Sequence, residues 1–561
     1  MPRRRKDRMR AGACFAAIFV VLILTLIIIC TVKFPKREEC PRGMFRTAAV
    51  ATDSQTCSNI GRDILRSGGS AVDGAIAALI CTSVTNPQSM GLGGGVIFTI
   101  REKNGKVKII NARETTPKNF KADLLSDCSN VTGTLPPETQ NTHVLLFSLC
   151  FIFLSLSLFI FLILSFSLSR LPLFLALSLS FCLYLSFPLC YALFLVSLSL
   201  SSLFKHPDGT LLQEGDTVRF EKLADTLQKV ADGGAEVFYS GDVAQALVRD
   251  VQAAGGTLTL EDLKSFKVVE SEPWNVSLDK YTMYFPPPPA GGAILSFILN
   301  IMERYEMNPT FIKGNEKVLT YHRYVEACKF ANAQKQFIKD PKFTSDKEAR
   351  NLTKVAFADD VKRRITNITH DAQYYNMMPH ADTQGTTHIS VLDGKGTAVS
   401  VTSTINYIFG SRVLSSNTGV ILNNELADFC GRTTHIHPGE QPPSSMAPVV
   451  LYSPSDQHTL VIGASGGSMI TTGMATALMN YLWLGKTLKE SINTPVVYVD
   501  GKNQLSFENT REDVIKALQQ LGHTVTDKPY FYNSVNAVSK HEDECVNAIS
   551  DKRKMGVPAG Y

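Results

Sequence analysis

The sequence predicts an α+β fold behind an apolar N-terminal segment, and three patterns carry this prediction. Residues 53–83 have apolar side chains at helical spacing. Residues 96–111 and 389–402 instead alternate in polarity around the turns Lys103-Asn104-Gly105 and Asp393-Gly394, as paired antiparallel strands do. A chain of 561 residues with 44% hydrophobic residues can bury a large core around such elements.

The formal net charge of +5 is concentrated in residues 1–10, which are predicted to be a cytoplasmic tail. Six basic residues, offset there by Asp7 alone, account for all of it: Arg3, Arg4, Arg5, Lys6, Arg8 and Arg10. Because the rest of the chain is formally neutral, no nucleic-acid-binding surface is predicted.

Residues 11–32 carry no charge, are rich in Ile, Leu and Val, and are long enough to span a bilayer. A signal peptide is the alternative, but the run exceeds the usual apolar core of about 7 to 15 residues, and residues 30–35 lack a small-residue cleavage site. The sequence therefore predicts an uncleaved transmembrane anchor. Positive charge before the anchor predicts a single-pass type II protein of the plasma membrane, with everything after Val32 outside the cell.

The helices and connectors are predicted in chain order from the same patterns. The helical segment 53–83 has Asp73 on its polar side and six apolar positions: Ile60, Ile64, Leu65, Val72, Ala75 and Leu79. Residues 220–254, 260–266 and 318–337 are also predicted to be helical. Residues 381–385 form a polar, glycine-ended connector, which suits a loop that is cut and then moves.

Residues 144–204 form an anomalous apolar insert, composed mostly of Leu, Ser, Phe and Ile with Arg170 as its only charge. It could be two further membrane spans broken near Arg170, Pro172 and Pro188. A translated pyrimidine tract explains the composition better, because all-pyrimidine codons encode Leu, Ser, Phe and Pro. A repeated CT dinucleotide in particular encodes alternating Ser and Leu.

Sequons and cysteines fit an exported domain in an oxidising compartment. Four Asn-x-Ser/Thr sequons are predicted glycosylation sites: Asn130, Asn275, Asn351 and Asn367. Twelve cysteines are consistent with disulfide formation but do not require it. No Cys or His cluster has zinc-ligand spacing, and residues 91–95 lack the Lys and Ser/Thr of a phosphate loop, so no metal or cofactor is predicted.

The central functional candidate is Thr386, which follows Gly385 at the end of the polar connector. If the bond between them is cut, Thr386 carries a hydroxyl nucleophile and a free α-amine with a pKa of about 7.7 to 8. Such an amine can act as the general base for its own hydroxyl. Taken alone, Gly-Thr-Thr is more typical of an ordinary strand or turn.

Four polar segments downstream carry residue types that a core does not need: 402–406, 423–429, 442–446 and 463–467. Each has an ordinary explanation as a turn, a cap or a bend. Together they supply two carboxylates for an ammonium group, hydroxyls for a carboxylate and glycine amides for an oxyanion. This combination is what a site for an amino-acid head group needs.

The order and spacing of these segments resemble the γ-glutamyl transpeptidase (glutathione hydrolase) family. From Thr386 to the closing Pro558-Ala559-Gly560-Tyr561 the chain is similar to the family's small subunit, and the resemblance also covers 46–128 and 217–385. Three segments resemble in particular the family members that cleave leukotriene C4: 86–95, 286–300 and 421–426. The resemblance implies the N-terminal-nucleophile hydrolase fold, an αββα sandwich of two stacked sheets between layers of helices.

The resemblance also implies the way in which the chain matures. Thr386 would attack the Gly385 carbonyl, giving a heavy chain at 33–385 and a light chain at 386–561 that stay associated. Thr404 would orient Thr386. Cys57 and Cys81 match a paired position of the family, which implies a disulfide between them.

The remaining implied roles concern the substrate. The amides of Gly466 and Gly467 would bind the oxyanion, while other side chains would hold the two charged groups of the γ-glutamyl moiety. The α-carboxylate would be bound by Arg113, Ser444 and Ser445. The α-ammonium would be bound by Asn406, Glu425 and Asp428.

The implied reaction is acyl transfer through a γ-glutamyl ester of Thr386, with glutathione or its S-conjugates such as leukotriene C4 as donors. Water, an acceptor amino acid or a dipeptide would remove the acyl group, and no cofactor is implied. The insert stands where the family has a long globular segment before Pro207. The alternative is therefore an inactive, unprocessed membrane protein.

Overall fold

The computed structural model describes residues 40–121, 125, 128, 198–377, 385–509, 512–526, 533–541 and 544–561. The predicted tail and anchor, the sequon at Asn130 and most of the predicted insert lie outside these residues. Across the described residues, no helix is both long and apolar enough to cross a membrane. The chain divides into units 1–43 and 44–561, and the fold belongs to the second.

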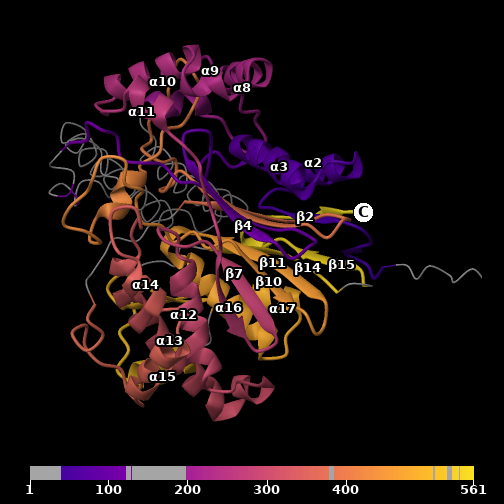
Figure 1. Cartoon of the computed structure of the whole chain (residues 1–561), viewed down its shortest axis with the longest axis vertical. Coiled ribbons are helices and arrows are strands. Elements are labelled where there is room, and N and C mark those ends of the chain that lie inside the picture. Colours follow the sequence, from indigo (N-terminus) through magenta and orange to yellow (C-terminus); the bar gives the residue numbers. More distant parts are fainter. Residues whose placement is uncertain are drawn as a thin grey trace, which may run out of the picture. The chain divides into compact units, whose positions relative to one another are not determined.

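Two seven-stranded antiparallel sheets run through the described part of this second unit (Figure 1). The first has the order β16 (Ala559–Gly560), β2 (Ala49–Ala51), β8 (Thr387–Leu392), β9 (Ala398–Thr404), β3 (Gly95–Arg101), β4 (Val107–Ala112), β5 (Val269–Ser271). The second has the order β1 (Met44–Phe45), β15 (Val546–Ile549), β14 (Ser534–Lys540), β11 (His458–Ser465), β10 (Val449–Ser453), β7 (Tyr281–Phe285), β6 (Trp274–Leu278). A separate pair joins β12 (Val497–Val499) to β13 (Leu505–Phe507).

Apolar clusters show how the layers stack. Small and β-branched side chains from both sheets, among them Ala49, Leu392, Val461 and Val538, form the core between the sheets. Helices α2 (Gln55–Arg66) and α3 (Ala71–Thr85) pack on the outer face of the first sheet. Helices α12 (Gly292–Glu303), α13 (Gly314–Gln334) and α16 (Ile470–Leu482) cover the outer face of the second sheet (Figure 1). This is the predicted αββα order.

The other helices connect or flank these layers. The α-helices are α7 (Leu198–Ser201), α8 (Glu221–Gly233), α9 (Ala235–Tyr239), α10 (Asp242–Ala253), α11 (Leu260–Ser265), α14 (Lys347–Asn351), α15 (Val355–Arg364), α17 (Leu488–Ile492) and α18 (Glu512–Gln520). The 3-10 helices are η1 (Ser202–Phe204), η2 (Pro309–Ile312), η3 (Lys335–Phe337), η4 (Glu425–Phe429), η5 (Gly467–Met469) and η6 (Lys552–Lys554). The structure thus confirms the predicted hairpins at 96–111 and 389–402. It also confirms the predicted helices at 260–266 and 318–337. The predicted helix at 220–254 is present as three helices, α8, α9 and α10.

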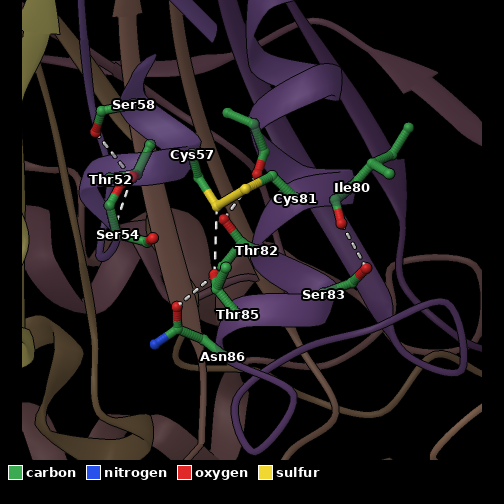
Figure 2. Close-up of a disulfide and its surroundings, with 11 residues drawn as sticks. Thr52, Ser54, Cys57, Ser58, Ile80, Cys81, Thr82, Ser83, Thr85 and Asn86 are labelled. Atoms are coloured by element: carbon green, nitrogen blue, oxygen red, sulfur yellow. Dashed lines mark hydrogen bonds between the residues drawn. A yellow bond between two sulfur atoms is a disulfide. The ribbon is translucent and has the colours of Figure 1, made fainter. Parts of the chain in front are cut away.

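The predicted helical segment at 53–83 is two helices, joined by a disulfide. The break falls before Ser70, whose side chain and backbone form a capping box with Asp73 at the start of α3. The Cys57–Cys81 disulfide links α2 to α3, as the resemblance implied (Figure 2). Ile60, one of the apolar positions of the predicted helix, does not reach the core and is 39% exposed. The buried face of α2 runs through Cys57, Ser58, Gly61 and Leu65 instead.

The end of the predicted apolar insert also needs correction. Residues 198–204 form α7 and η1, and Leu200 is fully buried against Ile405 and Ile421. The Phe204 ring contacts the Phe409 ring edge-on. Residues 198–204 therefore belong to the folded body, because their apolar side chains fill a cluster next to the end of β9.

Candidate active site

Thr386 directly precedes β8, the strand that pairs with β9. Its side chain is 2% exposed, and its Oγ1 donates a hydrogen bond to Thr404 Oγ1 at 3.4 Å. Thr404 Oγ1 in turn donates to the Gly385 carbonyl oxygen at 3.1 Å and accepts the Asn406 N–H at 2.8 Å. A single hydroxyl therefore contacts the predicted nucleophile and the carbonyl that this nucleophile would attack.

A buried ion pair contacts the carbonyl of Thr386. Lys554 Nζ donates to the Thr386 carbonyl oxygen at 2.6 Å and lies 3.1 Å from Asp53 Oδ2. Asp53 also accepts hydrogen bonds from Thr387 Oγ1 at 2.6 Å, Ser534 Oγ at 3.2 Å and Asn536 Nδ2 at 2.8 Å. With these partners, the ion pair fixes the backbone on which the Thr386 hydroxyl stands.

His388 does not supply a base to this site. Burial lowers the pKa of His388 to about 3, so its ring is neutral at physiological pH. The ring is fully buried, with Nδ1 2.9 Å from Thr402 Oγ1 and Nε2 2.9 Å from Ser390 Oγ. His388 is therefore a satisfied core histidine.

Arg113, at the end of β4, forms a second buried cluster with the acidic residues of η4. Its guanidinium is 0% exposed, donates from Nη2 to Asp428 Oδ2 at 2.6 Å and makes an ion pair through Nη1 with Glu425 Oε2. The Pro442 and Pro443 carbonyls accept further hydrogen bonds from Arg113 at 3.2 and 3.3 Å. The predicted carboxylate binder and the predicted ammonium binders therefore contact one another.

Two carboxylate oxygens of this cluster are unpaired. Glu425 Oε1 and Asp428 Oδ1 are buried and have no hydrogen-bond partner. Burial raises the pKa of Glu425 well above its usual range, although Arg113 opposes the shift. An ammonium group placed between these oxygens would satisfy both atoms and favour the charged carboxylates.

Glu114 adds a third buried carboxyl beside Arg113. Neither of its oxygens has a hydrogen-bond partner, and burial raises its pKa to about 7 despite the attraction of Arg113. Burial alone lowers the pKa of Arg113, but Glu425 and Asp428 outweigh burial and the net shift is upward. Arg113 therefore stays charged, while Glu114 titrates near neutral pH.

Asn406 joins the two clusters. Its backbone N–H contacts Thr404, and its side-chain Nδ2 donates to the Asn424 carbonyl oxygen at 3.0 Å. Asn424 directly precedes Glu425 at the start of η4. The structure thus brings Thr386, Thr404 and Asn406 together and ties them to η4.

The predicted serine donors follow the prolines that contact Arg113, and the predicted glycine donors follow β11. Ser444 follows the two prolines that bind Arg113, and its backbone N–H donates to the Pro289 carbonyl at 2.8 Å. Ser445 beside it is half-buried. Gly466 and Gly467 directly follow β11 and have φ values of 116° and 57°, a left-handed conformation that glycine adopts without strain. At Gly463 on the same strand, an added Cβ would meet the His388 ring, so β11 lies over the start of β8.

The described sequons differ in exposure. Asn275 on β6 and Asn367 after α15 are exposed, whereas Asn351 is half-buried and bonded to Glu348 and Lys354. Glycosylation at these positions stays a prediction.

One described group of side chains has the composition of a metal site: His322, Glu326 and His523. Lys329 Nζ lies 3.0 Å from His523 Nδ1 and 3.6 Å from Glu326 Oε1. Thr369 and Tyr375 donate hydrogen bonds to the two Glu326 oxygens at 2.8 and 2.7 Å. The lysine ammonium already provides the positive charge that a metal ion would bring to Glu326, and this group shares no residue with the candidate site.

Sequence reasoning missed Asp53, Lys554 and Glu114. Lys554 stands in the basic run 552–554, which is typical of a solvated surface, and Asp53 follows β2 as a turn residue would. The sequence also gave no sign of a second disulfide, between Cys128 and Cys430. The sequence feature that could have indicated Glu114 as a site residue is its position directly after Arg113.

A family model described as Gamma-glutamyltranspeptidase matches residues 57–142 and 190–561. The unmatched residues between them, 143–189, fall almost entirely in the predicted insert. The chain is 40% identical over 582 residues to the Glutathione hydrolase 5 proenzyme of Mus musculus, covering 98% of this chain and 99% of the mouse protein. The Homo sapiens protein of the same name is 38% identical, with 95% of this chain and 96% of the human protein covered.

Among solved structures, the fold is similar to the cephalosporin acylase from Bacillus halodurans. The TM-score is 0.70 at 20% sequence identity, and the match covers 95% of this chain and 98% of that chain. At this identity the similarity supports the fold alone.

Proposed function

The chain belongs to the gamma-glutamyltranspeptidase family, and we propose that Thr386 is the nucleophile by which it hydrolyses and transfers γ-glutamyl groups. The main support for this proposal is that the Thr404 hydroxyl contacts both Thr386 Oγ1 and the Gly385 carbonyl oxygen. In the uncut chain these contacts fit attack of Thr386 on its own preceding carbonyl. In the processed protein the same residues fit attack on a substrate amide.

The first stage is cleavage of the Gly385–Thr386 bond. Thr386 Oγ1 attacks the Gly385 carbonyl carbon, the C–N bond breaks as the nitrogen is protonated, and water hydrolyses the resulting ester. The Thr404 hydroxyl stabilises the developing negative charge on the Gly385 oxygen. The products are a new carboxylate on Gly385 and a free α-amine on Thr386.

That amine is the base for the second stage. The Lys554 ammonium, which contacts the Thr386 carbonyl, disfavours a second positive charge nearby and so favours the neutral amine. Thr386 Oγ1 attacks the γ-carbonyl of the substrate, and the amides of Gly466 and Gly467 bind the oxyanion. The amine leaving group departs, and water or an acceptor amine then cleaves the γ-glutamyl ester.

When the γ-glutamyl group binds, Arg113, Glu425 and Asp428 replace part of their contacts with one another by contacts with the substrate. The α-ammonium enters between Glu425 Oε1 and Asp428 Oδ1, the two buried oxygens that have no partner. The α-carboxylate binds Arg113 with help from Ser444 and Ser445, as a planar guanidinium allows. The substrate thus supplies one positive and one negative charge to a cluster that contains both signs.

Thr404→Val tests the bridging hydroxyl at almost constant volume. Val leaves the Gly385 oxygen and the Asn406 N–H without this partner, so we expect autocleavage to slow by roughly 10- to 100-fold. Pulse-chase labelling followed on reducing gels measures that rate. The exposed Thr210→Val is the matched control and should cleave like wild type. Unchanged cleavage in Thr404→Val would remove Thr404 from the mechanism.

We also propose glutathione S-conjugates, leukotriene C4 among them, as substrates beside glutathione. The support is the similarity to the Glutathione hydrolase 5 proenzymes and the segments 86–95, 286–300 and 421–426. Mass spectrometry of the purified protein with each donor should show loss of the γ-glutamyl group from both. Turnover of glutathione without turnover of leukotriene C4 would reject the conjugate proposal and leave the family activity intact.

The location proposed is the cell surface, with the catalytic part outside and residues 11–32 as the anchor. The disulfides Cys57–Cys81 and Cys128–Cys430 support an oxidising compartment. The exposed sequons Asn275 and Asn367 agree with export.

A further inference from the structure

The Cys128–Cys430 disulfide joins residues that lie on opposite sides of the proposed cleavage site in sequence. Cys128 belongs to the heavy chain and Cys430 to the light chain, with a separation of 302 residues. In the uncut chain this disulfide closes a loop. After cleavage between Gly385 and Thr386, the same bond connects two separate polypeptides.

The bond lies next to the part of the site that the two chains build together. Cys430 directly follows η4, which carries Glu425 and Asp428, and both carboxylates contact Arg113 of the heavy chain. The heavy-chain segment after Arg113 also pairs with light-chain backbone, since the Thr116 N–H donates to Glu440 at 2.9 Å and the Gly439 N–H donates to Thr116 at 2.8 Å. The substrate-binding cluster is therefore itself an interchain contact.

We propose that the processed protein is a covalent heterodimer, in which Cys128–Cys430 fastens η4 of the light chain beside Arg113 of the heavy chain. This inference rests on the proposed cleavage after Gly385. The light chain has two cysteines, Cys430 and Cys545, and Cys545 is also disulfide-bonded. A variant that is meant to release the light chain therefore has to replace both of these cysteines.

The test compares gels with and without reductant after free thiols of the full-length protein are blocked with N-ethylmaleimide. Dithiothreitol donates two electrons and two protons to each disulfide, which becomes two thiols, and is itself oxidised to a cyclic disulfide. Wild type should give two bands with reductant and one without it. Two bands in both lanes would overturn the covalent link, while one band in both lanes would overturn the proposed cleavage and the link with it.

Variants assign the link to its cysteines. Cys545→Ser should still run as one band without reductant, because Cys128–Cys430 remains, whereas Cys430→Ser combined with Cys545→Ser should release the light chain. Release by Cys545→Ser alone would contradict the assignment. The buried free Cys328 provides the matched control, and Cys328→Ser should behave like wild type.

Peptide mapping of wild type keeps the test decisive if a variant fails to fold. A non-reduced digest should contain one species joining the peptides of Cys128 and Cys430, and dithiothreitol should abolish it. A digest that joins Cys430 to any other cysteine would overturn the proposal.

Discussion

Replacing Thr386 by Ala should leave one uncut polypeptide with γ-glutamyl hydrolase activity at or below ~0.1% of wild type. The physical reason is that Ala has no hydroxyl to attack the Gly385 carbonyl. Without cleavage, no α-amine forms to act as the base. One substitution thus removes the nucleophile of both stages, and the measurements are a reducing gel and the hydrolysis rate of a γ-glutamyl anilide.

Thr386→Ser is the matched control, because it keeps both the hydroxyl and, after cleavage, the α-amine. It should be processed and retain measurable activity. Circular dichroism melts should show that Thr386→Ala is folded, since only one buried hydroxyl and one methyl group are lost. Processing of a folded Thr386→Ala variant into two chains would place the cleavage chemistry elsewhere.

Arg113→Lys should lower kcat/KM by roughly 10- to 1000-fold, equivalent to about 1.4 to 4 kcal/mol of transition-state stabilisation. Lysine keeps the positive charge that Glu425 and Asp428 need but loses the planar fork that holds a carboxylate bidentately. Autocleavage should continue, because it uses no free α-carboxylate. Steady-state kinetics with a γ-glutamyl anilide measure the effect.

Arg113→Ala separates the structural role of this residue from the binding role. It leaves two carboxylates buried without their cation, so we expect a loss of about 3 to 5 kcal/mol in the free energy of unfolding in addition to the loss of activity. The control Arg350→Lys alters a surface pair with Asp346, where side-chain exposures are 56% and 28%, and should change little. Unaltered kinetics in Arg113→Lys would exclude Arg113 from substrate binding.

Local patterns were sufficient for the elements that carry the nucleophile. The hairpin of β8 and β9 shows in the alternation of 389–402, and it brings Thr386 and Thr404 to the same end of paired strands. Side-chain periodicity predicted helical structure at 53–83, and the apolar positions Leu65, Ala75 and Leu79 are buried as expected. It did not show the break between α2 and α3 or which apolar positions stay exposed, because burial depends on which side the sheet covers. Ile60 is exposed for this reason, and Leu200 is buried by contacts with Ile405 and Ile421, which are far away in sequence.

Long-range pairing is the part that the sequence does not reveal. The Asp53–Lys554 pair joins residues 501 positions apart, and Cys128–Cys430 joins residues 302 apart. Arg113, Glu425 and Asp428 were all predicted as site residues, but as partners of a substrate. That they are partners of one another follows only when β4 and η4 are placed together in the fold.

N-terminal sequencing of the light chain tests the central claim most directly, because every proposed role of Thr386 requires it to be a chain terminus. The purified protein is separated on a reducing gel, and the band that contains the C-terminal region is subjected to Edman degradation. The sequence expected is Thr-Thr-His-Ile-Ser, beginning at Thr386. A light chain that begins at any other residue, or a catalytically active protein with no free terminus at Thr386, would contradict the account.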